Sequence, residues 1–363
     1  MASKFVSKVI LYYSIMKEAF IDKHLVVTIR DTEIPTPDAN QLLIRVVVSG
    51  SNPKDWKMPA HWPPDGTPTN QGDDIAGYVE AVGDGVVGYR RGDRVAAFHQ
   101  VMKPHGSWAE YAIAHSHATF HIPERTSFEE AATIPLAAIT AAIGLYQQLN
   151  LPLPWNPTNE PLPLVIYGGA TAVGAFAIKF ARLSNIHPLI VVAGRGRAFV
   201  ETIIDSDKGD TIIDYRDGDE AVRSGIKAAA KNKPIHYAFD AVSEKGSYEN
   251  IGEIMTAPGQ LLLVLPGVQY EKEGIVSRLT IAGSIHFPPT DGKTISETEF
   301  GAAFLQLMGR GLSQGWFSGH PFEVRPGGLA GIQDAMLDLK GGKASALKYV
   351  FRIGETEGVE QEY

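Results

Sequence analysis

The stretch LVIYGGATAVGAFAIKFARLSN, residues 164–185, decides the fold. Its first six residues are mostly apolar and end in two glycines, which is typical of a buried strand followed by a tight turn. The residues that follow place Val173, Phe176, Ala177 and Phe180 at the i, i+3, i+4, i+7 spacing of one helix face. A strand, a glycine turn and a helix in this order predict the phosphate-binding opening of a dinucleotide fold.

The glycine turn departs from the usual fingerprint at one position. Aligned to G-x-G-x-x-G, it has Gly169, Thr171 and Gly174, with threonine in place of the middle glycine. We expect Gly169 to make the turn and Gly174 to let the helix pack close to the strand. The Thr171 hydroxyl could donate to a phosphate oxygen beside the helix N-terminus. A turn that serves packing alone is the alternative. The residues expected to bind the cofactor here are Gly169, Ala170, Thr171, Ala172 and Val173.

Buried strands recur after this helix. Their apolar runs lie at 188–194, 210–215, 235–242, 259–267 and 279–287. Runs of this length, separated by helical stretches, indicate a parallel sheet covered by helices on both faces. The sequence therefore predicts an α/β protein that contains a doubly wound Rossmann domain.

The residues before this unit follow a different rhythm. Short strand patterns such as 42–50 fill the region up to about residue 135, where the capping box of Ser127 and Glu130 opens a helix. A proline-rich connector at 150–163 separates the halves. The last 75 residues do not continue the strand–helix alternation, and we expect them to complete the first domain. The predicted limits are 16–136 with 288–363 for that domain, 137–287 for the Rossmann domain, and 1–15 for an N-terminal extension.

Composition narrows the function classes. The chain has 363 residues, a formal net charge of −8 and no cysteine. Its length favours two domains, and its charge argues against a general nucleic-acid binder. The lack of cysteine excludes disulfides and cysteine-ligated zinc. We find neither a continuous apolar run of the roughly 18 residues that cross a bilayer nor a small-residue cleavage site, so we expect a cytoplasmic protein without a membrane partner.

The end of the second Rossmann strand indicates which dinucleotide binds. An NAD-specific site has an acidic residue about 20 residues beyond the first glycine, but 183–200 contains none. Gly194 leaves room there for a 2′-phosphate, which Arg195 and Arg197 could grip. Tyr215 could stack on the adenosine. The sequence therefore favours NADPH over NADH. The alternatives are that the arginines are solvated loop charges and that Tyr215 is a half-buried strand residue.

Six segments of the chain match one superfamily in order. They are NPKDWK (52–57), GDDIAGYVEAVG (72–83), YRRGDRVAAF (89–98), HGSWAEY (105–111), AATIPLAAITAAIGL (131–145) and YGGATAVGAFAIKFAR (167–182). On these segments the chain resembles the medium-chain dehydrogenases/reductases, above all the zinc-independent branch of quinone oxidoreductases and enoyl reductases that act in trans with fungal polyketide synthases. This resemblance implies a GroES-like, β-rich catalytic domain beside the Rossmann domain, with the active site between them, in a monomer or a homodimer.

The pair Asp73-Asp74 bears on the metal. In zinc-dependent relatives the resemblance places His-Glu at this position and a cysteine in the segment matching SGSNPKDW. Adjacent residues of an extended chain point to opposite faces, so the two carboxylates cannot readily chelate one ion. We therefore predict no metal, and we expect the histidines within 99–121 to serve packing or the surface. Without a Lewis acid, hydride addition to a conjugated C=C bond is easier than alcohol–ketone interconversion, because the charge enters a delocalised enolate.

The resemblance also suggests site residues around the nicotinamide. Lys57 is the first candidate donor, and its ammonium could polarise a substrate carbonyl or bind a cofactor phosphate, unless it is a rim charge. Thr140 would face the nicotinamide in the family, or it could bond its own i−4 carbonyl. Asn52 would shape the Lys57 loop and could reach the ribose, and Lys348 could return to the cofactor phosphates. Backbone groups near the carboxamide are expected at Leu265, Val268, Ser284 and Ile285.

These observations predict an NADPH-dependent reductase of an enone or enoyl substrate, for which a carrier-bound polyketide is one option. An NADPH:quinone reductase is the alternative within enzymes. A nucleotide-binding partner or structural protein with little turnover is the alternative from another class, since a fold does not determine a function.

Overall fold

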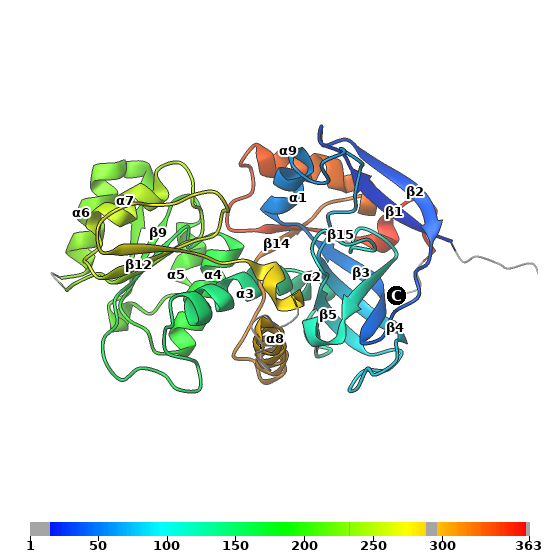
Figure 1. The fold of residues 1–363 in the computed structure, drawn as a ribbon, viewed down its shortest axis with the longest axis horizontal. Coiled ribbons are helices and arrows are strands. Elements are labelled where there is room, and N and C mark those ends of the chain that lie inside the picture. The colour runs from blue at the N-terminus through cyan, green and yellow to red at the C-terminus, as the bar shows by residue number, and fades with distance from the viewer. Residues whose placement is uncertain (1–14, 232, 288–295, 361–363) are drawn as a thin grey trace, which may run out of the picture.

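A computed structural model of the chain describes residues 15–231, 233–287 and 296–360. The predicted extension 1–15 lies, apart from Ile15, outside the described residues. Two sheets stand side by side, and helices α3 and α8 run between them (Figure 1). The α/β class, with a GroES-like domain beside a Rossmann domain, is confirmed.

The catalytic domain is built on a seven-stranded sheet within the described residues. Strand β15 pairs antiparallel with β3, so the C-terminal segment joins the sheet of the N-terminal segment. The hairpin of β1 (Ile15–Ile21) and β2 (Val27–Glu33) lies beside it. The sheet strands are β3 (Gln41–Gly50), β4 (Asp74–Val82), β5 (Arg94–Phe98), β6 (Tyr111–His115), β7 (Thr119–His121), β14 (Phe322–Val324) and β15 (Lys348–Arg352).

The nucleotide-binding domain contains six parallel strands in the order β10-β9-β8-β11-β12-β13. Counted from β8, this is the 3-2-1-4-5-6 order of dinucleotide-binding sheets. Its strands are β8 (Leu164–Tyr167), β9 (Leu189–Ala193), β10 (Thr211–Asp214), β11 (Tyr237–Asp240), β12 (Gly259–Leu263) and β13 (Ile275–Leu279). Its helices are α4 (Ala172–Leu183), α5 (Arg197–Glu201), α6 (Asp219–Ala229) and α7 (Ser247–Ile254).

The last predicted strand, 279–287, is misplaced. Strand β13 ends at Leu279, and the residues after Ile281 form the 3-10 helix η6 (Ala282–His286). A Cβ placed on Gly301 of α8 (Glu297–Gln314) would lie 2.7 Å from the Ile285 side chain. Only part of this run is buried: Ile285 packs against α8, whereas Ile281 and Phe287 are exposed, so the residues after Leu279 do not continue the sheet. Hydrophobic periodicity alone does not distinguish such a segment from a buried strand.

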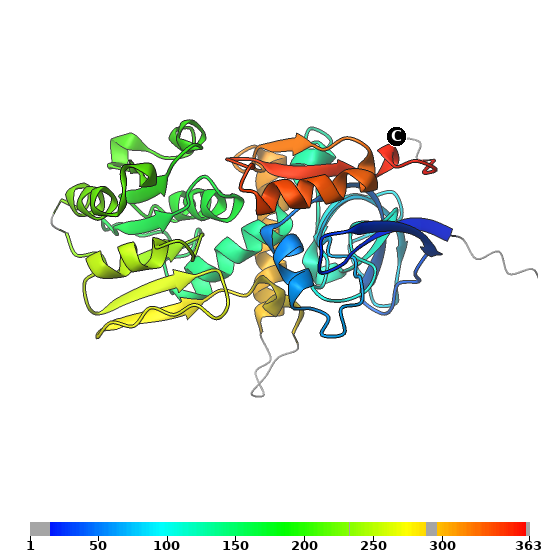
Figure 2. The ribbon, with the colours of Figure 1, turned by 90° about the horizontal axis from the view of Figure 1, so that it is seen from above.

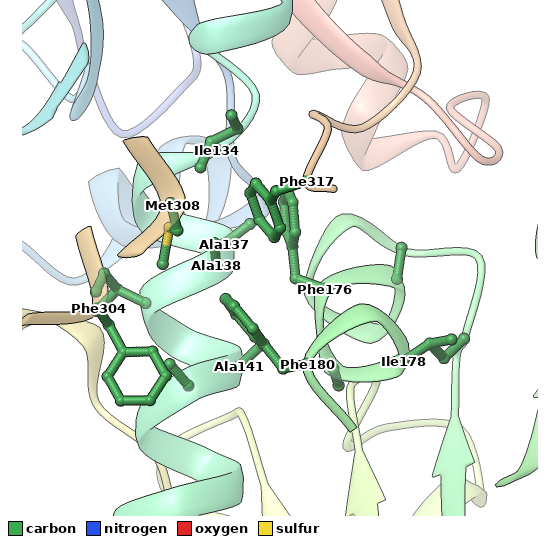
Figure 3. Packing of buried hydrophobic residues seen from close by; sticks show 14 of the residues in the cluster. Ile134, Ala137, Ala138, Ala141, Phe176, Ile178, Phe180, Phe304, Met308 and Phe317 are labelled. Carbon is green, nitrogen blue, oxygen red and sulfur yellow. The ribbon is translucent and has the colours of Figure 1, made fainter. Parts of the chain in front are cut away.

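An aromatic cluster joins the two domains at α3 (Pro135–Ala142), α4 and α8 (Figure 3). The rings of Phe180 and Phe317 stack with centroids 5.6 Å apart, and Phe304 stacks on Tyr146 at 5.1 Å.

The helical stretch Phe128–Gln148, which contains α3, is long and apolar enough to span a membrane by length and composition alone, but 83% of its most apolar window is buried inside the protein.

Three imidazoles meet where the catalytic domain contacts α8. His115, His117 and His286 have ring centroids 5.1 to 5.7 Å apart. Among the described residues neither ring nitrogen of His286 has a hydrogen-bond partner. Burial lowers the pKa of His117 to about 4 and the pKa of His286 to about 2. In the described part of the chain no three His, Asp or Glu side chains are arranged to hold a metal ion.

Acid should destabilise the protein through these histidines. A histidine titrates near pH 6.5 in the unfolded chain but lower in the folded one, so the unfolded state binds more protons below pH 6.5. The free energy of unfolding then falls by up to about 1.4 kcal/mol per pH unit for each histidine. We expect His286→Phe to lose about 1 kcal/mol less than the wild type between pH 7.5 and 5.5 in urea unfolding. An equal loss in both proteins would contradict this account.

Candidate functional site

Asp74, the first residue of β4, is fully buried, and its carboxylate gathers donors from three separate segments. Oδ1 accepts the backbone N–H of Leu136, at the start of α3, at 2.7 Å. Oδ2 accepts the side-chain amide of Asn52 at 2.8 Å and the ammonium of Lys348 on β15. The Lys348 side chain is 4% exposed, so this is an interior ion pair, and such a pair depends on its additional hydrogen bonds for stability.

This arrangement corrects two expectations from the sequence. The Lys348 ammonium was expected at the cofactor phosphates, but it is held inside the catalytic domain by Asp74 and by Asn52 Oδ1, 3.2 Å away. Both ends of the Asn52 amide are engaged in this cluster, so its side chain does not extend towards a ribose. Asn52 does shape its loop, because its N–H donates to Asp55 at 2.7 Å.

Asp73 has a different lysine as its partner. Its carboxylate lies 2.5 Å from Lys54 Nζ, which also contacts Asp55 at 3.1 Å. Burial raises the pKa of Asp55 to about 7 and the pKa of Asp73 to about 6, against the opposing effect of Lys54. The neighbouring carboxylates of Asp73 and Asp74 therefore bind separate cations, as expected for adjacent residues of an extended chain.

Lys57, at the end of α1 (Pro53–Lys57), reaches across to the nucleotide-binding domain. Its Nζ lies 2.9 Å from a carboxylate oxygen of Glu244, which belongs to the loop after β11. The backbone N–H of Ser243 donates to Asp240 at 2.9 Å and anchors this loop to its strand. The side chains of Lys57 and Glu244 are 26% and 45% exposed, so water reaches the pair and weakens it.

Thr140 takes the structural role that the sequence left open. Its hydroxyl donates to the carbonyl of Leu136, one turn earlier on α3, at 2.7 Å. Its own carbonyl accepts the hydroxyl of Thr280 at 3.0 Å, just after β13. Thr140 therefore lies beside the carboxyl edge of the parallel sheet, which is the edge where ligands of such sheets bind.

The turn after β8 has the geometry that a pyrophosphate requires. Gly168, with φ of 78°, makes the left-handed turn that was expected of Gly169. A Cβ on Gly169 would collide with Val191 of the neighbouring strand, and one on Gly174 would collide with the Gly168 carbonyl. Thr171 caps α4 by accepting the Gly174 N–H at 3.0 Å.

The open end of α4 fits a phosphate. The amides of Ala172 and Val173 lie at the first positions of the helix, where backbone N–H groups have no acceptor within the helix. Ala170 is half-buried in the turn beside them. The Thr171 hydroxyl differs from the expectation, because it donates to the Gly168 carbonyl at 2.8 Å and so stabilises the turn instead of pointing to a ligand.

The residues expected around the 2′-phosphate gather after β9 and β10. A Cβ on Gly194 would collide with the ring of Tyr215, so this glycine makes room for the tyrosine and not directly for a phosphate. Tyr215 is 44% exposed, as a stacking platform requires. Arg195 and Arg197 are exposed; Arg195 Nη2 donates to the carbonyl of Gly342 at 2.6 Å, and Arg197 pairs with Glu201 at 2.9 Å.

The backbone groups expected near the carboxamide follow β12 and β13. Leu265 and Val268 are half-buried in the loop after β12, and Val268 lines a shallow hollow together with Arg278. Ser284 is half-buried and Ile285 fully buried in η6, so Ile285 can offer only its backbone to a ligand.

Sequence reasoning missed the partners of these residues. Glu244 contacts Lys57 and Gly342 contacts Arg195, but both belong to segments that carried no motif of their own. One signal was present: Asn52 followed by Asp55 has the spacing of a helix-capping box, which would have assigned Asp55 to the loop of Lys57.

Removing Lys348 should destabilise the fold rather than only weaken cofactor binding. In Lys348→Met the Asp74 carboxylate stays buried without its cation, which costs about 3–5 kcal/mol. In Lys348→Met/Asp74→Asn much of that loss should be recovered. The matched control is Lys17→Met, which removes an exposed pair with Asp31 and should cost below about 1 kcal/mol. Urea unfolding measures all of these; equal costs for Lys348→Met and Lys17→Met would refute this account.

Comparisons with known proteins agree with this geometry. Residues 38–124 match the family model of the alcohol dehydrogenase GroES-like domain. The solved quinone oxidoreductase of Coxiella burnetii shares the fold at a TM-score of 0.72 and 21% identity, covering 93% of this chain and 99% of its own. The CurK enoyl reductase does so at 0.73 and 18% identity, covering 92% and 98%.

A nearer relative is the trans-enoyl reductase fsr4 of Gibberella fujikuroi. It is 45% identical over 323 residues, which are 88% of this chain and 93% of the relative. With that identity over nearly the full length of both proteins, and with a dinucleotide turn facing a GroES-like domain, the chain belongs to the trans-enoyl reductase family of the medium-chain dehydrogenases/reductases.

Proposed function

We propose that this protein is an NADPH-dependent reductase of a conjugated C=C bond in an enoyl thioester or enone, and that it works without a metal. The family implies a nicotinamide cofactor, and NADPH is the finer proposal. One observation supports the reaction: Lys57 forms an ion pair with Glu244 of the nucleotide-binding domain. Glu244 comes two residues after Val242, and the Val242 side chain lies against Gly168 of the dinucleotide turn. An ammonium of the catalytic domain thus lies beside the cofactor turn.

The bound nicotinamide supplies a hydride, and the protein supplies binding and charge stabilisation. As the β-carbon is reduced, negative charge moves to the carbonyl oxygen of the substrate. We assign the stabilisation of that charge to the Lys57 ammonium, which contacts the nucleotide-binding domain through Glu244. Glu244 holds the ammonium, and Trp56 supports it, with its ring centroid 5.3 Å from Lys57 Nζ. We propose that water delivers the final proton to the α-carbon.

The carboxylates of Asp73 and Asp74 support a metal-independent reaction. Each is bound by a lysine, Lys54 or Lys348, and Asp74 accepts two further hydrogen bonds. Carboxylates engaged in this way would have to give up these partners before they could bind a metal ion.

The proposed substrate class follows the names of the relatives. The fsr4 protein is named a trans-enoyl reductase and CurK an enoyl reductase, whereas the Coxiella protein is named a quinone oxidoreductase. We therefore place enoyl reduction first and quinone reduction second. We also propose that the enoyl group arrives on a carrier protein, and that the enzyme is a cytoplasmic monomer or homodimer.

A substrate panel tests the reaction. The purified protein should oxidise NADPH with enoyl thioesters or enones and much more slowly with quinones. Lys57→Met should lower kcat by about 10- to 100-fold, because it removes one donor to the developing charge. NADPH consumption followed at 340 nm measures both.

Two controls accompany the panel. Lys23→Met, an exposed lysine in the turn after β1, should leave kcat unchanged. Metal analysis should find no stoichiometric zinc. Protein that binds NADPH but turns over none of the acceptors would leave only the binding-protein alternative, and faster turnover with quinones would favour the second candidate.

The arginines after β9 test the choice of cofactor. Arg195→Ala/Arg197→Ala should weaken NADPH binding by at least about tenfold, because each lost charge-assisted hydrogen bond is worth about 1.5–3 kcal/mol. NADH, which has no 2′-phosphate, should bind nearly as it does to the wild type. Fluorescence titration measures both dissociation constants, and equal losses would contradict a 2′-phosphate at these residues.

A further inference from the structure

The loop between α9 (Ile332–Lys340) and β15, residues 341–347, belongs to the catalytic domain but extends to the nucleotide-binding domain. Both ribbon views show this red loop reaching the green helices (Figures 1 and 2). Two contacts hold it there. Arg195 Nη2 donates to the Gly342 carbonyl at 2.6 Å. Ala346 packs so closely on Gly196 that a Cβ added to this glycine would lie only 2.8 Å from the Cβ of Ala346. The loop therefore packs against the residues proposed to bind the 2′-phosphate.

We propose that Lys343 of this loop is a further ligand of the adenosine 2′-phosphate, so that both domains build the site for this group. The inference rests on the proposed preference for NADPH. Lys343 directly follows Gly342, whose carbonyl contacts Arg195, and its flexible four-carbon stem carries a charge that can move.

The present ion pairs show why Lys343 is the cation that can move. Arg197 is bound by Glu201 at 2.9 Å, and Arg216 is bound by both oxygens of Asp214. Each of these arginines is the cation that neutralises its carboxylate. Among the described residues Arg195 pairs with no carboxylate, so it can bind a phosphate without breaking an ion pair, whereas Arg197 first has to leave Glu201.

Lys343 can leave its present partner at little cost. Its Nζ lies 2.6 Å from Asp338, but Arg325 binds the other oxygen of the same carboxylate at 3.0 Å. Asp338 therefore keeps a cation when Lys343 turns towards a phosphate. The Lys343 side chain is 69% exposed, and an ion pair in such a position contributes little to stability.

Arg195 retains the capacity to share the ligand. A guanidinium has five N–H donors, and Gly342 uses one of them, which orients the group and leaves the others for phosphate oxygens. The phosphate would then connect Arg195 of one domain to Lys343 of the other. NADH has no such group, so it cannot make this connection.

Binding measurements on the full-length protein test the role of Lys343. We would titrate the wild type, Lys343→Ala, Arg195→Ala and the matched control Lys340→Ala with NADPH, NADH, adenosine 2′,5′-bisphosphate and ADP. Lys340 is an exposed lysine three residues earlier on the same segment. We expect Lys343→Ala to weaken the two 2′-phosphorylated ligands about fivefold, the effect of one exposed charge pair, and to change NADH and ADP less than about twofold.

Further arms separate the possible outcomes. Lys340→Ala should bind all four ligands like the wild type, Lys343→Arg should keep most of the affinity, and the effect of Lys343→Ala should shrink as salt rises. A wild type without preference for NADPH would overturn the proposed cofactor. A wild type that prefers NADPH, loses this preference in Arg195→Ala and keeps it in Lys343→Ala would overturn the role of Lys343 alone. Equal weakening of NADPH and NADH in Lys343→Ala would also overturn it.

Discussion

The carboxylate of Asp74 is the group on which the arrangement of the candidate site depends. It binds the loop that leads to Lys57 through Asn52, the C-terminal strand through Lys348, and the first turn of α3 through the Leu136 N–H. A buried charge is costly unless it is paired and hydrogen-bonded, so this position holds three segments of distant sequence in one geometry. Helix α3 then continues into the aromatic cluster with α4 (Figure 3), so the same carboxylate also sets how the catalytic domain meets the nucleotide-binding domain.

The contacts between the domains differ in strength. At the cluster, Lys179 of α4 donates to the carbonyls of Ser318 and Gly319 at 2.8 and 2.7 Å and lies over the ring of Phe176. Burial lowers the pKa of Lys179 to about 8, so it is still mainly an ammonium at neutral pH. The pair of Lys57 with Glu244 is exposed by comparison and is worth little in water. The cluster therefore contributes more than the exposed pair to holding the two domains together.

The sequence predicted local structure well and long-range partners poorly. The turn after β8 and the parallel strands depend on neighbours within a few residues, and their patterns could be read directly. The turn was predicted correctly, but its left-handed residue is Gly168 and not Gly169, one position later. Lys348 was assigned to the wrong partner because Asp74 lies 274 residues away and no pattern connects them. Gly194 was explained by a ligand, whereas the ring that requires it belongs to Tyr215, the residue after β10. The strand expected at 279–287 failed because Ile285 packs against α8 while Ile281 and Phe287 are exposed, and an apolar run does not reveal what covers it.

Asp73 and Asp74 show how the charges of the candidate site are arranged. If they bound one cation together, that cation would be the natural electrophile of the site. Each instead binds its own lysine, and both lysines lie within the catalytic domain. In the proposed reaction the electrophile is then Lys57, whose carboxylate partner belongs to the other domain. An electrophile of this kind is weaker than a metal ion, and it suffices where the developing charge is delocalised over a conjugated system. The strength of the electrophile therefore favours conjugated double bonds over simple ketones as substrates.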